Sequence, residues 1–200
     1  MNYNYIAPYY DFLSRLCFLN RQQMAHKIIL NYVKPNDKIL WLGGGSGWFL
    51  PKMDELGFPL TIDYVEVSTI MINKAKQHKL KHLSVNFITQ DILHFYPDKI
   101  YDVVITAFIF DHFTTTDCQE MFYRFTLNLN HKAKWIYIDF NEDQNQMQRL
   151  LTKTMVVFFN LVAGFRTNDF PKVDILFNSY QLIDKQSYFL DYIQSKIYQK

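Results

Sequence analysis

Cysteine, glycine and proline are all scarce in this 200-residue chain, which contains 2 Cys, 6 Gly and 6 Pro. Cys17 and Cys118 lie far apart and form no C-x-x-C pair, which argues against a disulfide framework and a thiolate metal site. Two separate thiols of this kind are typical of a protein from the reducing cytoplasm. Since no Pro- or Gly-rich linker, repeat or low-complexity tract divides the chain, we expect a single domain over residues 1–200.

Long hydrophobic runs and clusters of basic charge are also missing. The most apolar stretch, residues 155–165, is shorter than a membrane span, and the N-terminal segment lacks the basic and apolar regions of a signal peptide. Residues 155–165 can form a lid, a face for transient contact with a membrane surface, or a core-facing helix. Lys and Arg (21) nearly balance Asp and Glu (19), giving a net charge of +2. We therefore expect a soluble cytoplasmic protein that does not bind nucleic acid.

Short apolar runs alternate with helical patterns through most of the chain. Apolar runs of strand length occur at residues 38–42, 61–67, 84–89, 101–107 and 134–140. Segments with a helical pattern lie near residues 48–57, 68–79, 116–129 and 144–163. Nearly continuous apolar strands separated by helices are typical of a parallel sheet covered on both faces. The sequence therefore predicts a doubly wound, mostly parallel α/β fold over residues 36–200.

Both ends of the chain depart from this alternation. Two strand-like runs, LIDKQSYFL and YIQSKIYQ, follow each other near the C-terminus with almost nothing between them. So short a connection joins antiparallel strands, and the last strand should therefore run against its neighbours. Residues 1–35 indicate one or two helices that form an N-terminal cap before the sheet begins.

Local signals mark several of the predicted helix ends. Ser68 is placed to cap the helix that starts near residue 68, and Thr116 with Gln119 forms a capping-box pattern for the next one. Gly57 stands where the end of a helix favours a residue with positive φ.

A glycine-rich turn lies between the first predicted strand and its following helix, in ILWLGGGSGWFL, residues 39–50. Doubly wound folds bind ligands at this point, where glycines let backbone N–H groups approach a ligand closely. A dinucleotide fingerprint, G-x-G-x-x-G, needs a glycine where Trp48 stands, and a P-loop fails at the same place. What remains is G-x-G-x-G, formed by Gly43, Gly45 and Gly47. A tight structural turn without a ligand is the alternative.

A hydrophobic strand followed by G-x-G-x-G resembles motif I of the class I S-adenosylmethionine-dependent methyltransferases. The resemblance runs over residues 38–140 and implies a Rossmann-like methyltransferase fold with a seven-stranded sheet, and S-adenosyl-L-methionine as cofactor. The cofactor contacts that it implies within the sheet edge and its loops are Gly43, Gly44, Gly45, Gly47, Glu66, Val67, Met71, Asp91, Ile92 and Thr106.

The family assigns roles to several of these positions. An acidic residue that closes the second strand binds both ribose hydroxyls; Glu66 stands there, and its two oxygens match two adjacent donors. Asp91 resembles the aspartate that faces the adenine amino group, and Met71 is placed like a residue that packs on the adenine ring. Thr106 and Phe108 match the segment that lines the methionine end of the cofactor. As alternatives, Glu66 is a solvated residue before a helix, and Asp91 only caps a short helix.

Two further features bear on this resemblance. The first position of motif I is usually acidic, whereas Trp41 stands here and cannot accept a hydrogen bond, so an acceptor such as a backbone carbonyl near Gly43 must replace it. The N-terminal IAPYYDFLSRLCFLN resembles the opening of the ubiquinone/menaquinone-biosynthesis C-methyltransferases. In that subgroup this helix folds over the cofactor, which makes Tyr10 a candidate contact.

Asp111 and His112 follow the fourth predicted strand, at the edge where substrates bind, and can serve as base and orienter of the reaction. A hydrogen-bonded pair on the surface is the alternative. The resemblance implies methyl transfer to a small molecule, and the N-terminal motif and an aromatic content of 18% favour an apolar or aromatic acceptor. A binding or scaffolding protein that has the cofactor fold without turnover is the alternative function.

Overall fold

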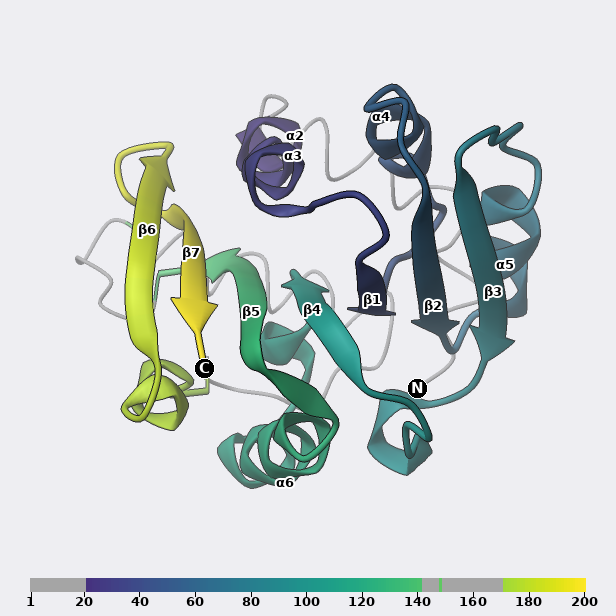
Figure 1. Cartoon of the computed structure of the whole chain (residues 1–200). Coiled ribbons are helices and arrows are strands. Elements are labelled where there is room, and N and C mark those ends of the chain that lie inside the picture. Colours follow the sequence, from purple (N-terminus) through teal and green to yellow (C-terminus); the bar gives the residue numbers. More distant parts are fainter. Residues whose placement is uncertain (1–20, 142–147, 149–170) are drawn as a thin grey trace.

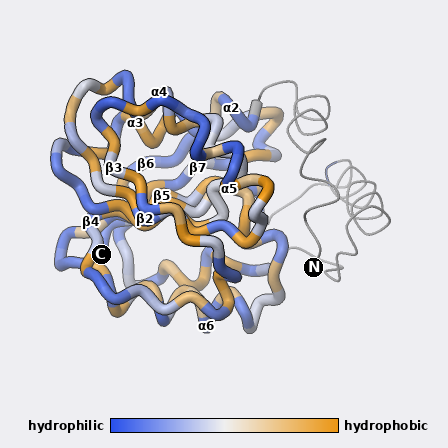
Figure 2. The backbone as a smooth tube through the Cα atoms, turned by 90° about the vertical axis from the view of Figure 1, so that its right-hand side faces the viewer, coloured by the Kyte–Doolittle hydropathy of each residue, from blue (hydrophilic) through white to orange (hydrophobic). Residues whose placement is uncertain are grey.

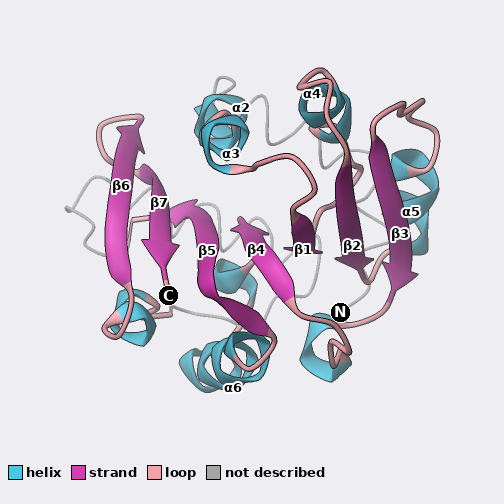
Figure 3. Ribbon diagram, in the orientation of Figure 1, coloured by secondary structure: helices cyan, strands magenta, loops and turns pink. Residues whose placement is uncertain are grey.

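The computed structural model describes residues 21–141, 148 and 171–200, and its centre is one seven-stranded sheet (Figures 1 and 3). The strands follow each other across the sheet in the order β3-β2-β1-β4-β5-β7-β6. Their bounds are β1 (Lys38–Leu42), β2 (Leu60–Glu66), β3 (Leu83–Thr89), β4 (Tyr101–Ala107), β5 (Leu129–Phe140), β6 (Gln181–Tyr188) and β7 (Ile193–Gln199). The chain reverses its winding direction between β1 and β4, which makes this the switch point of a doubly wound sheet.

Strand directions match the sequence prediction. Neighbouring strands from β3 to β5 pair in parallel, whereas β7 pairs antiparallel with both β5 and β6. The short β6–β7 connection dictates this arrangement, because a hairpin can only return the chain in the opposite direction. The prediction of a mostly parallel sheet with an antiparallel last strand is therefore confirmed.

Helices cover both faces of the sheet (Figure 3). The α-helices are α2 (Arg21–His26), α3 (Ile28–Tyr32), α4 (Leu50–Asp54), α5 (Thr69–Ala75) and α6 (Thr115–Thr126). Three short 3-10 turns are η2 (Ile92–His94), η3 (Phe110–His112) and η4 (Asp174–Phe177). Within the described ranges, no helix is long and apolar enough to cross a membrane.

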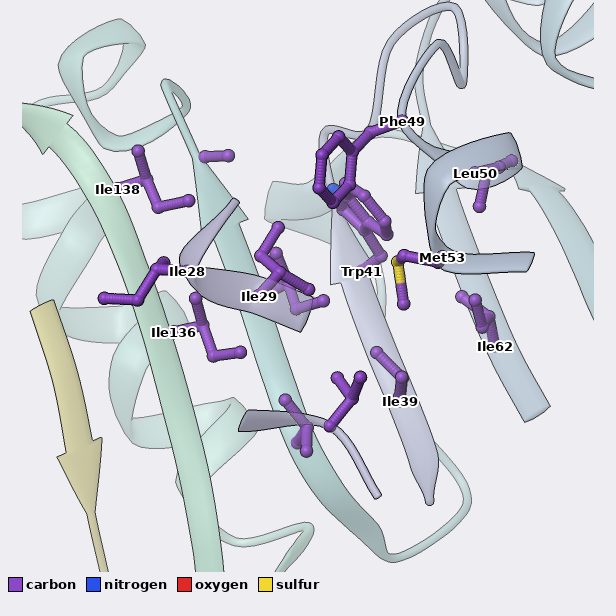
Figure 4. Close-up of a cluster of buried hydrophobic side chains, with 14 of the residues drawn as sticks. Ile28, Ile29, Ile39, Trp41, Phe49, Leu50, Met53, Ile62, Ile136 and Ile138 are labelled. Atoms are coloured by element: carbon purple, nitrogen blue, oxygen red, sulfur yellow. The ribbon is translucent and has the colours of Figure 1, made fainter. Parts of the chain in front are cut away.

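The hydrophobic core forms two layers, one on each face of the sheet. Successive residues of a strand point to opposite faces of the sheet. In β1, Ile39 and Trp41 belong to the layer that contains residues of α2, α3, α4 and α5. Leu40 and Leu42 belong to the layer that contains residues of α6 and η4. Figure 4 shows the first layer around Trp41, and Figure 2 shows apolar residues concentrated in the central strands. Because both faces are buried, the strands need apolar residues at nearly every position.

The predicted element bounds agree with the structure for most strands, and they differ at β5. Its predicted start was residue 134, but β5 begins at Leu129, with a register shift opposite Tyr101 and Val103 of β4. A hydrophobicity pattern does not detect the start of β5, because the stretch NHKAK there is mostly polar. This stretch lies where the pairing with β4 is irregular.

The predicted helix caps had mixed outcomes. The Ser68 hydroxyl accepts a hydrogen bond from the Met71 N–H at 3.3 Å, and Gly57 has φ +75°, as expected. The Thr116–Gln119 capping box was wrong: α6 begins one residue earlier, and Thr114 with Asp117 forms the box. Thr114 precedes the helix in extended conformation, whereas Thr116 already lies inside it. Residues 1–20 of the predicted cap, and all of the 144–163 helix except Gln148, lie outside the described residues.

Candidate active site

The glycine loop follows β1 at the carboxyl edge of the sheet and leads into α4. Gly43, Gly45 and Gly47 have φ of +66°, +64° and +71°, in the left-handed region that favours glycine. Pro51 lies in the first turn of α4, where a missing N–H leaves no helical bond unmade. Glycine is therefore favoured at every second position of G-x-G-x-G, because the backbone has a positive φ there.

The glycines differ in what a side chain would meet. A Cβ on Gly43 would stand 2.5 Å from Ile109, one on Gly44 would stand 2.1 Å from the Tyr64 ring, and one on Gly47 would stand 2.8 Å from Ala75. At Gly45, no atom lies within 4 Å of the Cβ position. Three glycines therefore allow close packing of the loop, whereas Gly45 borders open space.

Glu66 joins the end of β2 to this loop. One carboxylate oxygen accepts a hydrogen bond from the Gly45 N–H at 3.1 Å, and the other accepts one from the Ser68 N–H at 2.8 Å. The parallel pairing of β1 with β2 brings these groups to the same edge. Burial raises the pKa of Glu66, and the hydrogen bonds from Ser68 and Gly45 oppose that rise. With 8% of its surface exposed, Glu66 is not a solvated residue.

Ser46 supplies a second polar group in the same loop. Its hydroxyl is buried and has no hydrogen-bond partner within the described ranges of the chain. The Glu66 carboxylate interacts with the backbone N–H groups of Gly45, Ser68 and Val67. Since its two oxygens offer about four lone-pair sites, it can accept a further hydrogen bond. An orphaned hydroxyl, spare acceptor capacity and open space beside Gly45 fit a polar ligand that carries adjacent hydroxyl groups.

The remaining predicted cofactor residues lie in different environments. Val67 is 41% exposed, whereas Met71 and Ile92 are buried. The Asp91 carboxylate accepts a hydrogen bond from the Leu93 N–H at 2.9 Å and so caps η2. Because Glu66 pairs with Thr89 at the end of β3, Asp91 follows at the same edge of the sheet. Tyr10 lies outside the described residues.

Thr106 at the end of β4 and Trp41 in β1 form hydrogen bonds or ring contacts with other residues of the protein. Thr106 is buried, and its hydroxyl accepts a hydrogen bond from the Trp135 indole N–H at 2.9 Å. Phe108 has φ +53°, a conformation that costs a non-glycine residue about 1–3 kcal/mol and is found often at functional sites. Trp41 packs in the core against Tyr64, whose hydroxyl donates to the Gly45 carbonyl at 3.2 Å. The usual acidic position of motif I is therefore part of the core here.

Asp111 and His112 lie in η3, directly after β4. His112 Nε2 is 3.3 Å from an Asp111 carboxylate oxygen, and both side chains are largely buried, so this is not a surface pair. Burial lowers the pKa of His112 to about 4, and the charge of Glu66 opposes that shift. Burial raises the pKa of Asp111 above the usual carboxyl range. The interaction of His112 with Glu66 connects this pair to the glycine-loop site.

Asp139 is a third acidic group at this edge, and no motif in the sequence predicted it. It lies one residue before the end of β5 and is 2% exposed. Burial and the charge of Asp111 raise the pKa of Asp139 well above the usual carboxyl range. The signal that would have found it is a carboxylate inside the apolar run WIYIDF, where an ionised group is costly.

Comparison with known proteins agrees with this geometry. Residues 39–132 match a family model described as a methyltransferase domain. Residues 39–132 are therefore similar to a methyltransferase domain, and the solved structures below show the fold of S-adenosylmethionine-dependent methyltransferases. The matched residues run from β1 through the glycine loop to the beginning of β5. No curated protein matches the sequence.

Several solved structures have the same fold as this chain. The N-methyltransferase NodS from Bradyrhizobium japonicum WM9, in complex with S-adenosyl-L-homocysteine, has a TM-score of 0.64 and 14% identity, and covers 90% of this chain and 86% of its own. Magnesium protoporphyrin IX methyltransferase from Synechocystis PCC 6803 has a TM-score of 0.62 and 15% identity, covering 91% and 84%. The PH0226 protein from Pyrococcus horikoshii OT3 has a TM-score of 0.62 and 20% identity, covering 90% and 89%.

Proposed function

We propose that this protein transfers a methyl group from S-adenosyl-L-methionine to a small apolar or aromatic acceptor. The observation that carries the proposal is the buried Glu66 carboxylate, bonded to the Gly45 N–H beside open space. When bound, the cofactor supplies a methyl group that is activated by the neighbouring sulfonium. The protein must align the acceptor with that group and exclude water, and both depend on a preformed site.

Different residues at the carboxyl edge of the sheet bind different parts of the cofactor. Glu66 accepts hydrogen bonds from the ribose hydroxyls, and the loop from Gly43 to Gly47 provides backbone contacts to the cofactor. Asp91 and Ile92 face the adenine with Val67 and Met71, and Thr106 belongs to the methionine end. Tyr10, which lies outside the described residues, is proposed as a further cofactor contact from the family resemblance alone. These roles follow the family pattern, and the positions of Glu66 and Gly45 support them.

The acceptor side lies at the ends of β4 and β5. Asp111 takes the proton that leaves the acceptor. His112 orients the Asp111 carboxylate through the 3.3 Å contact between His112 Nε2 and a carboxylate oxygen. Burial keeps His112 neutral near pH 7, because its pKa lies at about 4. A neutral imidazole holds the carboxylate without carrying a charge into the site.

An aromatic acceptor is supported by rings that gather beside the glycine loop. His26 lies 4.9 Å from Trp48, 5.4 Å from Phe49 and 5.9 Å from Phe108, measured between ring centroids. Phe108 also contacts the Phe140 ring at the end of β5, at 5.3 Å. This cluster supports the ubiquinone/menaquinone-biosynthesis type of acceptor that the N-terminal motif suggests. Location in the cytoplasm remains a prediction from the two separate cysteines.

Calorimetric titration with S-adenosylhomocysteine tests the binding step directly. Thermal unfolding is a second measurement of the same step. At a ligand concentration of about 100 times Kd, the free energy of unfolding should rise by roughly 2.7 kcal/mol, which raises Tm. Transfer of a labelled methyl group to a panel of quinols, phenols and aromatic amines then tests turnover. Binding without transfer to any compound favours the non-catalytic alternative, and absence of binding at millimolar ligand contradicts both.

A further inference from the structure

Asp139 and Gln194 are both buried, and they lie directly opposite each other in the antiparallel pair of β5 and β7. These two strands are neighbours in the sheet (Figure 1). Each is 2% exposed. Within the described ranges, neither Asp139 Oδ2 nor Gln194 Oε1 has a hydrogen-bond donor. Two acceptor oxygens without donors, on directly opposed residues, are costly if both remain acceptors.

The orientation of the Gln194 amide is fixed by its other end. Gln194 Nε2 donates to an Asp191 carboxylate oxygen at 2.9 Å, so exchanging the amide oxygen and nitrogen would oppose two acceptors there. The oxygen therefore stays an acceptor. Opposed residues in an antiparallel pair have Cβ atoms about 4.5–5.5 Å apart, within reach of a side-chain hydrogen bond. If Asp139 Oδ2 carries a proton, it can donate a hydrogen bond to Gln194 Oε1, and both oxygens then have a partner.

The other oxygen of Asp139 connects β5 to η3. Asp139 Oδ1 accepts a hydrogen bond from the Phe140 N–H at 2.9 Å. The backbone N–H groups of Phe110 and Asp111 also interact with this carboxyl group. A neutral carboxyl group can accept these bonds on one oxygen and donate from the other. Asp139 therefore links the end of β5 to the turn that carries Asp111 and His112.

We propose that Asp139 is a positioning residue that keeps one buried proton and, as a neutral carboxylic acid, holds η3 so that Asp111 faces the methyl acceptor. This inference rests on the proposed function. In the reaction, a lone pair on the acceptor forms the new bond to the methyl carbon, and the electron pair of the breaking C–S bond stays on sulfur. The proton of the acceptor O–H or N–H moves to the Asp111 carboxylate, which becomes a neutral acid.

The charges around Asp139 favour its neutral form. Asp111 lies on η3, and Asp191 bonds to Gln194 from the β6–β7 turn, so both neighbours are acidic. Lys196 projects from β7 on the same face but forms an ion pair with Asp174 at 2.5 Å. His112 is adjacent to Asp111, and burial keeps it neutral near pH 7, because its pKa lies at about 4.

The dependence of stability on pH tests this inference without the acceptor. A carboxyl group whose pKa is raised in the folded state loses stability as pH rises toward that pKa. As pH rises above about 4, where the unfolded carboxyl group loses its proton, the folding equilibrium constant of the wild type should therefore fall by up to about tenfold per pH unit for this proton. Asp139→Asn removes this part of the slope, because an amide has the same shape but does not titrate. Glu120→Gln, exposed on α6, is the control that keeps the wild-type slope.

A second measurement and a second variant separate the proton from a general role in packing. Infrared difference spectra at pH 7 should show protonated carboxyl absorption in the wild type that decreases in Asp139→Asn. The absorption that remains belongs to Asp111, because burial raises its pKa to about 7. Asp139→Leu cannot hold η3, so it should be less stable than Asp139→Asn at every pH, whereas the Asn variant restores stability. An Asp139→Asn variant with the wild-type slope and an unchanged band overturns the inference. Failure of the wild type to bind S-adenosylhomocysteine contradicts the proposed function instead, and leaves these two results unaffected.

Discussion

The two halves of the carboxyl edge satisfy their polar groups in different ways. At the β1–β2 half, Glu66 receives hydrogen bonds from the backbone of the glycine loop and of Ser68. At the β4–β5 half, Asp111 and Asp139 lie buried together, and their pKa values rise through burial and, for Asp139, through the charge of its neighbour. The first half is built as a fixed binding site, and the second keeps groups whose protonation can change during a reaction. Substitutions in the two halves should therefore affect binding and pH dependence separately.

Gly44→Ala should have the largest effect, and Gly45→Ala is its matched control. The new methyl group at Gly44 would stand 2.1 Å from the Tyr64 ring, which is fully buried and cannot move aside. We expect a loss of about 3 kcal/mol in the free energy of unfolding, measured with urea. At Gly45 the methyl group meets open space, and the positive φ alone should cost about 1–2 kcal/mol.

The two glycine variants should rank in the opposite order for binding. The methyl group of Gly45→Ala projects into the space that we assign to the cofactor, next to the Glu66 carboxylate. Its affinity for S-adenosylhomocysteine should therefore fall at least tenfold, corrected for the folded fraction. Wild-type affinity in Gly45→Ala would show that this space belongs to no cofactor.

Glu66→Ala should weaken S-adenosylhomocysteine binding by about 1.5–3 kcal/mol, the range for hydrogen bonds to a charged group. The Gly45 and Ser68 N–H groups also lose their acceptor, so the free energy of unfolding should fall as well. Glu55→Ala is the control, because Glu55 forms an exposed ion pair with Lys52, a kind of contact that contributes little to stability. An unchanged affinity in Glu66→Ala, measured by calorimetry, removes this carboxylate from the site.

His112 should give the β4–β5 half a second dependence on pH, of opposite sign to that of Asp139. Burial lowers the pKa of His112 to about 4, whereas an unfolded chain binds the proton near pH 6.5. The unfolded state therefore gains protons first, and stability falls as pH falls between these values, by up to about 1.4 kcal/mol per pH unit. His112→Gln should remove this contribution from urea unfolding curves, whereas His82→Gln, on the surface, should not. Equal slopes in both variants contradict the burial of a neutral His112.

The comparison also explains what the sequence could predict. The strands, the glycine loop and Glu66 are local features, because continuous apolar runs and a glycine spacing are visible along the chain. Asp139 becomes significant only when β7 places Gln194 opposite it and β4 brings Asp111 beside it. These residues are distant in sequence, and no spacing rule connects them. The orphaned Ser46 hydroxyl was missed for the same reason, because its burial depends on packing.

The start of α6 provides the smallest and most local test. The Thr114 hydroxyl accepts a hydrogen bond from the Asp117 N–H at 3.2 Å, and the Asp117 carboxylate accepts one from the Thr114 N–H at 3.1 Å. Thr114→Ala should therefore cost about 1 kcal/mol in the free energy of unfolding, and Thr116→Ala should cost almost nothing. If β5, rather than the cap of α6, holds η3, Thr114→Ala should leave the pH slope assigned to Asp139 unchanged. A Thr114→Ala variant that lost this slope would show instead that α6 positions the turn, since η3 ends two residues before the cap.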